Sequence, residues 1–324
     1  MATGNSFRQI NLVADVAGRA RLHDVNVVNP WGIAMGPTPL WVANEGSATA
    51  TVYTWPGDGS TPVKQLMVKV PPGTTGQVFN PTDTFLERKG GTTGVARFLF
   101  DTEGGQIVAW SNTTTPLDRS TVTAQVANHV YLGLALGQTP NGPRLFAADI
   151  IGRIDVFDPK YRLIARPGAF VDPTLPAGLG PYNVAYLDGM IYVAYAVNGP
   201  GATVAGAISV FTTTGTFVKR LVTGGRLRAP WGMVIAPDGW GRFGGALLVG
   251  NVENGQIHAY NRHTGAALGV LRDGAGKPLA NSGLWGLHFG NGIFGRADDL
   301  VFAAGVNDYR HGLVGVIRPN FPVG

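Results

Sequence analysis

Apolar and polar residues follow two patterns that recur in pairs along the chain. In the first run of each pair the apolar residues are nearly continuous, as in residues 40–44 (LWVAN) and 247–251 (LLVGN). In the second run they alternate with polar residues, as in residues 153–158 (RIDVFD). Continuous apolar runs of this length are typical of strands covered on both faces, and alternation is typical of half-buried strands. The pattern therefore predicts an all-β chain.

Six such pairs occur, and a short anchor sequence precedes each one. The clearest anchors are residues 29–34 (NPWGIA), 229–234 (APWGMV) and 283–287 (GLWGL). The residues that mark the shared anchor position lie about fifty positions apart and are Gly32, Gly76, Gly133, Asn183, Gly232 and Gly286. A fourth strand follows each pair, for example at residues 63–70 and 217–222. Four strands in a repeat of this length are typical of one β-propeller blade.

The sequence thus predicts a single domain with the fold of a six-bladed β-propeller. The expected blades cover residues 26–70, 71–127, 128–172, 178–223, 226–272 and 281–318. The sixth blade lacks a fourth strand at the end of the chain, whereas residues 7–13 form a spare strand before the first anchor. We expect this N-terminal strand to join the last blade and close the ring, which leaves no long open sheet edge.

The amino-acid composition excludes several kinds of fold, catalytic group and binding partner. The chain has 48 Gly, 22 Pro, 14% charged residues and no Cys. Few charges and many turn-forming residues argue against a helical bundle, and the absence of Cys excludes disulfides, thiolate metal ligands and cysteine nucleophiles. The net charge of +5 is not gathered into a basic arm, so we expect no nucleic-acid partner. No apolar run approaches the length of a transmembrane helix, so we expect no insertion into a membrane. We also expect the protein to be a monomer.

Parts of the repeat resemble known propeller sequences. Residues 29–34 followed by residues 41–44 (WVAN) resemble NHL-type repeats. Over almost its whole length the sequence resembles a large, functionally uncharacterised family of bacterial six-bladed propeller proteins, with matches that include residues 152–158 (GRIDVFD), 170–178 (FVDPTLPAG) and 284–292 (LWGLHFGNG). The resemblance implies the propeller fold and carries over no catalytic residue.

The same resemblance has an implication for the cellular localisation of the protein. Some members of that family carry secretion signals and C-terminal sorting tails, so the resemblance implies a secreted or periplasmic protein. Residues 1–6 show no charged-then-apolar signal and residues 319–324 show no sorting tail. A cytoplasmic location therefore stays open.

Candidate binding residues gather where propeller topology brings two sets of segments to one face. The start of each innermost strand and the loop between the second and third strands both lie at the same mouth of the central channel. Four aromatic residues recur at the strand-start position, namely Trp31, Tyr182, Trp231 and Trp285. We expect them to line the mouth and to stack on a small-molecule ligand. The alternative is that the rings wedge between neighbouring blades.

Oxygen-bearing side chains in the same mouth loops predict a metal site. Asp149 is the main candidate because it ends an apolar strand, where an unpaired carboxylate is costly. Glu103, Asn251 and Asn44 are the other candidate ligands. Oxygen ligands without thiols suit Ca²⁺, and six-bladed propeller lactonases and related hydrolases carry a similar calcium site. The alternatives are that Asp149 accepts backbone N–H groups or pairs with Arg153, that Glu103 is a solvated turn residue, and that the two asparagines form a repeated structural turn.

The histidines supply a candidate proton carrier and an alternative metal site. No HxH or HxxxH pair occurs among the six histidines, so a local zinc motif is absent. His311, in the expected mouth loop of the sixth blade, is the candidate general base. A transition-metal site would instead require three residues to meet among His23, His129, His288 and His311.

These residues together predict a small-molecule hydrolase or lyase with a metal-assisted site at the channel mouth. In this hypothesis Asp149, Glu103 and Asn251 hold the metal, which polarises a carbonyl or activates a bound water, and His311 moves protons. An enzyme of this kind would be lactonase-like or esterase-like. The alternative is a non-catalytic propeller that binds a protein or glycan partner through one face. The sequence contains no GxSxG elbow or P-loop, so it does not support a serine nucleophile or a nucleotide site.

Overall fold

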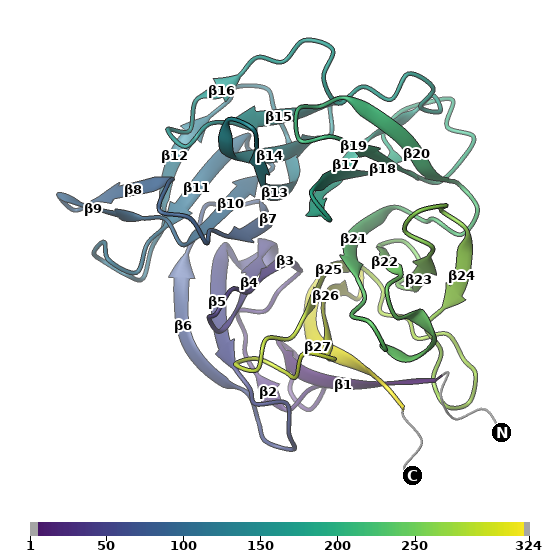
Figure 1. Cartoon of the computed structure of the whole chain (residues 1–324). Helices are drawn as coiled ribbons and strands as arrows, with labels where there is room; N and C mark the ends of the chain where they lie inside the picture. Colours follow the sequence, from purple (N-terminus) through teal and green to yellow (C-terminus); the bar gives the residue numbers. More distant parts are fainter. Residues whose placement is uncertain (1–5, 321–324) are drawn as a thin grey trace.

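The computed structural model describes residues 6–320 and arranges them as six sheets around a central axis (Figure 1). Residues 1–5 and 321–324 lie outside the described residues, and with them most of the two terminal segments in which a signal and a sorting tail were sought. The regular elements of the described residues are β-strands, apart from 3₁₀ turns at η1 (Glu45–Ser47) and η2 (Gly241–Phe243). Within residues 6–320, no helix has the length and apolar character needed to cross a bilayer. The predicted six-bladed β-propeller is confirmed.

The first three blades follow the chain from the axis outward. Blade one contains β3 (Pro30–Ala34), β4 (Leu40–Asn44), β5 (Thr49–Thr54) and β6 (Val63–Lys69). Blade two contains β7 (Thr74–Phe79), β10 (Phe98–Thr102), β11 (Gln106–Trp110) and β12 (Thr121–Gln125). Blade three contains β13 (Tyr131–Thr139), β14 (Gly142–Asp149), β15 (Arg153–Phe157) and β16 (Leu163–Ile164).

Blades four and five repeat this order, and blade six receives strands from both ends of the chain. Blade four contains β17 (Leu179–Leu187), β18 (Met190–Val197), β19 (Ala207–Phe211) and β20 (Phe217–Thr223). Blade five contains β21 (Pro230–Ile235), β22 (Leu247–Asn251), β23 (Ile257–Tyr260) and β24 (Ala267–Val270). Blade six contains β25 (Leu284–Phe289), β26 (Leu300–Val306), β27 (His311–Pro319), β1 (Phe7–Ala14) and β2 (Leu22–His23).

The N-terminal strand closes the ring, as the sequence predicts. Strand β1 pairs antiparallel with β27, in a register that places Phe7 opposite Pro319 and Ala14 opposite Leu313. The side chain of Leu12 is fully buried between blades six and one. The two ends of the chain are therefore held together by backbone hydrogen bonds and by apolar packing.

The hydrophobic core is divided among the spaces between neighbouring blades. Each of six apolar clusters joins the faces of two adjacent blades, and one of them joins blade six to blade one. Between blades one and two, for example, the ring of Trp41 stacks on Phe98 with centroids 4.2 Å apart. Both faces of a blade are thus covered, which explains why the second strand of each blade is continuously apolar.

Small residues at the anchor position allow the innermost strands to lie against each other. A Cβ atom on Gly32 would stand 2.6 Å from the carbonyl oxygen of Thr75 in blade two. A Cβ atom on Gly286 would stand 2.6 Å from the carbonyl oxygen of Trp31 in blade one. In blade four the position is Asn183, whose Nδ2 donates a 2.7 Å hydrogen bond to the carbonyl of Trp231 in blade five. The anchor residues therefore set the spacing of the inner strands.

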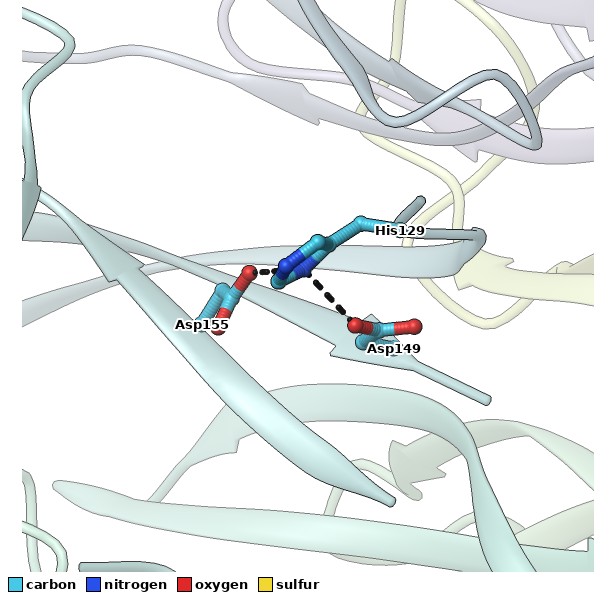
Figure 2. A group of neighbouring side chains, drawn as sticks. All are labelled: His129, Asp149 and Asp155. Carbon is cyan, nitrogen blue, oxygen red and sulfur yellow. Dashed lines mark ion pairs between the residues drawn. The ribbon is translucent and has the colours of Figure 1, made fainter. Parts of the chain in front are cut away.

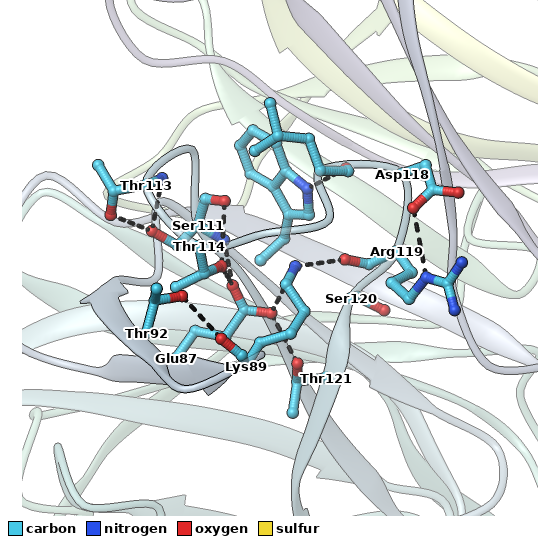
Figure 3. Close-up of polar contacts among 12 residues, drawn as sticks. Glu87, Lys89, Thr92, Ser111, Thr113, Thr114, Asp118, Arg119, Ser120 and Thr121 are labelled. Atoms are coloured by element: carbon cyan, nitrogen blue, oxygen red, sulfur yellow. Dashed lines mark hydrogen bonds and ion pairs between the residues drawn. The ribbon is translucent and has the colours of Figure 1, made fainter.

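A hairpin that the sequence did not predict projects from blade two (Figure 1). It consists of β8 (Leu86–Lys89) and β9 (Thr92–Val95) and lies between the two innermost strands in chain order. The buried carboxylate of Glu87 holds the hairpin to the loop after β11 (Figure 3). It accepts hydrogen bonds from the Ser111 N–H at 2.8 Å and the Thr121 hydroxyl at 2.7 Å. This polar network explains how a segment without a blade-like apolar pattern is ordered.

Ring closure by β1 can be tested with a cavity-forming substitution. We expect Leu12→Ala to lower the free energy of unfolding by about 2–5 kcal/mol, since it removes a fully buried side chain. Arg8→Ala, at an exposed position of the same strand, is the control and should change stability little. Chemical denaturation of both variants measures the difference, and equal stabilities would contradict the closing role of the strand.

The close approach of the inner strands predicts a second effect on stability. Gly32→Ala places a methyl group against the backbone of blade two and should destabilise the fold by about 1–3 kcal/mol or more. Gly59→Ala is the matched control, because a Cβ atom there meets nothing within 4 Å. Thermal unfolding followed by circular dichroism compares the two, and a neutral Gly32→Ala variant would contradict this account of inner-strand packing.

Candidate metal centre

The four aromatic residues predicted at the channel mouth do meet in space. The rings of Trp31 and Trp285 stack with centroids 3.5 Å apart, and Trp231 meets both edge-on at about 6 Å. The ring centroid of Tyr182 lies 6.0 Å from that of Trp285. The three tryptophans are at most 7% exposed, so they pack against one another across the axis. We call these four residues the aromatic plug; ligand stacking on it stays a prediction.

A compact group of ligating side chains lies in blade three, beside the plug. His129, Asp149 and Asp155 bring their ligating atoms within 4.8 Å of one another (Figure 2). The Nδ1 atom of His129 is 2.8 Å from Oδ2 of Asp149 and 2.7 Å from Oδ2 of Asp155. Both carboxylates are buried, and the His129 side chain is 11% exposed. We call these three residues the His-Asp-Asp centre.

The strand register of blade three explains why the three side chains converge. Asp149 ends β14 and pairs across the ladders with Tyr131 of β13 and Arg153 of β15. Asp155 lies two residues beyond Arg153, which places it on the same face of the sheet as Asp149. His129 lies two residues before the start of β13 and so reaches the same end of the blade. A tight turn between β14 and β15 therefore brings both carboxylates to one imidazole.

The hydrogen bonds around the centre do not include Oδ2 of Asp149, which faces only the His129 ring and the Arg153 guanidinium. Oδ1 of Asp149 accepts backbone N–H groups from Val130 and Ile151, each at 3.2 Å. Oδ2 of Asp155 accepts the hydroxyl of Tyr131 at 2.6 Å. Oδ2 of Asp149 is buried and makes no hydrogen bond with any described residue. The Nδ1 of one imidazole carries at most one hydrogen, so it cannot donate to both carboxylates.

Burial dominates the electrostatics of the centre. It raises the pKa of Asp149, and the nearby charge of Asp155 raises this pKa further, whereas the two backbone N–H bonds and His129 lower it. Burial and the hydrogen bond to Asp155 also raise the pKa of Tyr131, which keeps its hydroxyl as a donor. The Nε atom of Arg153 lies 3.6 Å from Oδ2 of Asp149, on a side chain that is 54% exposed. The centre therefore concentrates negative charge beside one solvent-exposed cation.

A further buried carboxylate lies across the blade interface from Tyr131. Oδ1 of Asp101 accepts the Thr75 hydroxyl at 2.9 Å and the Gly76 N–H at 2.6 Å. Its Oδ2 is buried without a hydrogen-bond partner among the described residues. Burial raises the pKa of Asp101 to about 7, and the bonds from Thr75 and Gly76 offset only part of that rise. A neutral form of Asp101 is therefore well populated near neutral pH.

The other predicted oxygen ligands have separate local roles. Asn44 donates to the hydroxyls of Thr49 and Thr51, at 3.2 and 2.9 Å, within its own blade. Asn251 accepts the Arg228 N–H at 2.7 Å and donates to a carbonyl in the following turn. These contacts fit the structural-turn interpretation of the repeated asparagines. Neither bond set involves the His-Asp-Asp centre.

Glu103 lies in the turn between β10 and β11 and is outside the His-Asp-Asp centre. Its backbone N–H donates to the Gly73 carbonyl at 2.8 Å. Partial burial raises the pKa of Glu103, and the charge of Glu45 from blade one raises it further. The carboxylates of Glu45 and Glu103 therefore lie close enough to repel each other. Glu103 is not part of the ligand group found within residues 6–320.

The histidines do not converge on one site. Nδ1 of His311 lies 2.7 Å from a carboxylate oxygen of Asp15, and Nε2 of His23 lies 2.8 Å from the Asp15 carbonyl. Both therefore lie in blade six, whose strands lie across the ring from those of blade three (Figure 1). His288 lies on β25 and contacts the central cavity. Of the four candidate histidines, only His129 belongs to the ligand group found within residues 6–320, and His311 contacts Asp15.

One ligand of the site was missed by sequence reasoning. Asp155 belongs to a strand that was correctly expected, but it was not singled out, and Tyr131 was expected at the mouth only as the start of an inner strand, with no role at a metal site. The available signal was the carboxylate of Asp155 between Ile154 and Val156, both of them buried. An acidic residue in the middle of such a strand needs a partner.

Comparison with known proteins places the chain in a family. No family model matches it. The uncharacterised protein R648 of Acanthamoeba polyphaga mimivirus is 32% identical over 94% of this chain and 78% of its own length. The uncharacterised protein L690 of the same virus is 30% identical over 90% of this chain and 80% of its own length. The chain belongs to the family of R648 and L690. These relatives are viral, so the bacterial affiliation inferred from the sequence is not supported, and the NHL-like character of the repeats is unconfirmed.

Solved structures agree with the fold. The PQQ-bound aldose sugar dehydrogenase of Streptomyces coelicolor has a TM-score of 0.55 and 13% identity, covering 97% of this chain and 98% of its own. BBS1N from its complex with ARL6DN, in a crystal soaked with lead, has a TM-score of 0.50 and 12% identity, covering 99% of both chains. At this level of identity the similarity shows the propeller fold alone.

The raised pKa of Asp101 predicts a pH-dependent contribution to stability. The folded state holds a proton on Asp101 that the unfolded state releases near its ordinary pKa of 3.8. This group therefore lowers stability as the pH rises from about 4 to about 7, by a few kcal/mol at most. Asp101→Asn is uncharged at every pH, so its stability relative to the wild type should improve between about pH 4 and about pH 7.

Urea unfolding at several pH values measures this difference. Asp83→Asn is the control, because Asp83 is a largely exposed acid of the same blade. A constant difference between Asp101→Asn and the wild type across the pH range would contradict the buried, proton-binding role of Asp101.

Proposed function

We propose that the His-Asp-Asp centre binds a divalent transition metal ion and that the protein is a metal-dependent, small-molecule hydrolase or lyase. The observation that carries the proposal is the meeting of one imidazole nitrogen with two buried carboxylate oxygens, at 2.7 and 2.8 Å. One N–H can satisfy only one of these oxygens, and Oδ2 of Asp149 is otherwise without a hydrogen bond. A dication between the three atoms would balance the charge of both carboxylates.

The donor set favours a particular class of metal. Imidazole nitrogen is a good ligand for Zn²⁺, Fe²⁺ and related ions, whereas Ca²⁺ takes oxygen ligands. One nitrogen from His129 with oxygens from Asp149 and Asp155 therefore suits Zn²⁺ or Mn²⁺ better than the Ca²⁺ expected from the sequence. The hydroxyl of Tyr131 bonds to Asp155 at 2.6 Å and would orient this ligand.

The number of ligands supports a reactive rather than a purely structural metal. Structural zinc sites use four protein ligands, whereas catalytic sites use three and leave a position for water or substrate. When bound, such a metal supplies an activated water or a polarised carbonyl. Arg153 is the cation at the solvent-exposed edge of the centre, so its guanidinium would stabilise negative charge that develops on a substrate oxygen. Esters and lactones are substrates that develop such a charge.

Calorimetric titration with Mn²⁺ and with Zn²⁺, after chelator treatment of the protein, tests metal binding. We expect about one equivalent to bind the wild type, and Asp149→Asn to weaken binding by about 100-fold or more, because it removes a charged ligand. His263→Gln is the control, since His263 is an exposed residue on the outer hairpin of blade five. Binding that is absent from the wild type, or unchanged in Asp149→Asn, would show that the three residues form only an ion pair.

Turnover is tested separately, on a panel of esters and lactones. We expect hydrolysis by the metal-loaded wild type that is lost on chelation, restored by the metal and absent in Asp149→Asn. A protein that binds the metal at the centre but turns over no substrate in the panel would contradict the enzymatic part of the proposal. It would favour the non-catalytic propeller that binds a protein or glycan partner.

A further inference from the structure

A small cavity lies at the mouth of the channel, between blades four and five. It has a volume of about 180 Å³ and is lined by Tyr182, Ala196, Val197, Ala205, Ala229 and Glu253. This is the volume of about six water molecules, so the cavity accepts a small chemical group rather than a whole drug-sized molecule. No residue of the His-Asp-Asp centre lines it, so the two sites are separate.

The lining of this mouth cavity combines one carboxylate with one aromatic ring. Glu253 is exposed in the turn between β22 and β23, and Tyr182 of β17 is partly exposed. The other lining residues are Ala and Val, and neither Lys nor Arg is among them. A carboxylate attracts a cation through its charge, and an aromatic ring attracts one through its electron-rich face. The lining therefore favours a positively charged group that also has apolar surface.

The carboxylate of Glu253 has no protein cation as its partner among the described residues. It takes part in none of the ion pairs found within residues 6–320. Arg228, on the connection before β21, donates through Nη1 to the carbonyls of Gly225 and Leu227 at 3.2 and 2.7 Å. Its guanidinium is thus engaged by its own loop, and the charge of Glu253 is left for a ligand.

Negative charge extends from Glu253 to the corresponding turns of two other blades. Burial raises the pKa of Tyr182, and the charges of Glu103 and Glu253 raise it further. Burial and the charge of Glu45 raise the pKa of Glu103 in the same way. The chain as a whole carries a net charge of +5. These glutamates therefore form a local region of negative potential on a basic protein, and such a region attracts cations.

A second tyrosine extends the aromatic surface beyond the cavity. The ring of Trp285 lies 6.0 Å from that of Tyr182 and 5.7 Å from that of Tyr309, which is 46% exposed. Residues 307–309 all have positive φ, at 56, 54 and 63°. This conformation is uncommon for residues other than glycine, and it is found most often at functional sites. Burial and the charge of Glu253 raise the pKa of Tyr309, so the carboxylate lies within electrostatic range of both tyrosines.

We propose that the mouth cavity binds a small organic cation with an alkylated ammonium group, with Glu253 as the counter-ion and Tyr182 as the aromatic contact. A quaternary ammonium has no N–H to donate, so it is recognised by negative charge and apolar contact rather than by hydrogen bonds. A nitrogen that carries three methyl groups fits a cavity of this volume, and the rest of the ligand would lie toward Tyr309. The proposal is independent of metal binding and of turnover at the His-Asp-Asp centre.

Three probes of similar size separate the features of the proposal by isothermal titration calorimetry on chelator-treated protein. Choline has a quaternary ammonium, 3,3-dimethyl-1-butanol has the same shape with carbon in place of nitrogen, and ethanolamine has the charge without the methyl groups. We expect choline to bind at one site, about tenfold or more tighter than 3,3-dimethyl-1-butanol. Ethanolamine should bind more weakly than choline, and added NaCl should weaken the binding of choline.

A substitution of the counter-ion tests the role of charge. Glu253→Gln keeps the size of the side chain and should lower the affinity for choline about fivefold or more, without changing that for 3,3-dimethyl-1-butanol. Asp238→Asn is the matched control. Asp238 is an exposed acid of the same blade, in the connection between β21 and η2 at the opposite end from Glu253. This variant loses the same charge and should bind choline like the wild type.

A pair of substitutions tests the aromatic contact. Tyr182→Phe keeps the ring and should bind choline like the wild type, whereas Tyr182→Leu removes the ring and should lose the preference for choline over ethanolamine. Thermal unfolding of both variants checks that they fold. If Tyr182→Leu does not fold, the comparison of choline with ethanolamine on the wild type still tests the aromatic contact.

Three results would overturn the proposal. The first is a wild type that binds no choline. The second is a wild type that binds 3,3-dimethyl-1-butanol or ethanolamine as tightly as choline, which would show an apolar pocket or a simple ion pair. The third is a loss of choline affinity that is equal in Glu253→Gln and Asp238→Asn, or absent from both, which would show that Glu253 is not the counter-ion. The first two results need no variant.

Discussion

The structure depends on the contact between inner strands of neighbouring blades at one residue per blade. A side chain at Gly32 or Gly286 would collide with the backbone of the next inner strand, so these strands lie as close as glycine permits. Asn183 is the variation on this rule, because its side chain enters the same space and bonds to the next blade. With the inner strands at this spacing, the apolar faces of adjacent blades meet, and the core forms as six clusters between them.

The same spacing divides the axis into two regions of different character. Where the inner strands begin, large aromatic side chains fill the space, and Trp31 stacks on Trp285. Further along, the lining residues are smaller, and a neutral cavity is left between the inner strands of the six blades. The plug also contacts the blade that carries the His-Asp-Asp centre, since Trp231 donates a hydrogen bond to the Leu132 carbonyl of β13, the strand that His129 precedes.

The repeat made most of the fold predictable, whereas the partners of a site depend on the packing of faces. Strand pairs, blade number and the closing strand follow from local pattern, and so does the expectation that Asp149 needs a partner. The alternative partners expected for Asp149, backbone N–H groups and Arg153, are both found. The sequence could not show that His129 and Asp155 also meet Asp149, because both faces of a propeller blade are buried and alternation does not tell which face carries Asp155. The hairpin at residues 86–95 was missed because it is ordered by hydrogen bonds to Glu87 rather than by an apolar pattern.

The central functional claim is that His129, Asp149 and Asp155 form a metal centre rather than a buried ion pair. Anomalous diffraction from crystals of the protein soaked in Mn²⁺ tests this claim most directly. We predict a strong anomalous peak that lies within about 2.3 Å of the His129 nitrogen and of one oxygen from each carboxylate. A map without a peak at these residues, with Nδ1 of His129 still in contact with both carboxylates, would contradict the account.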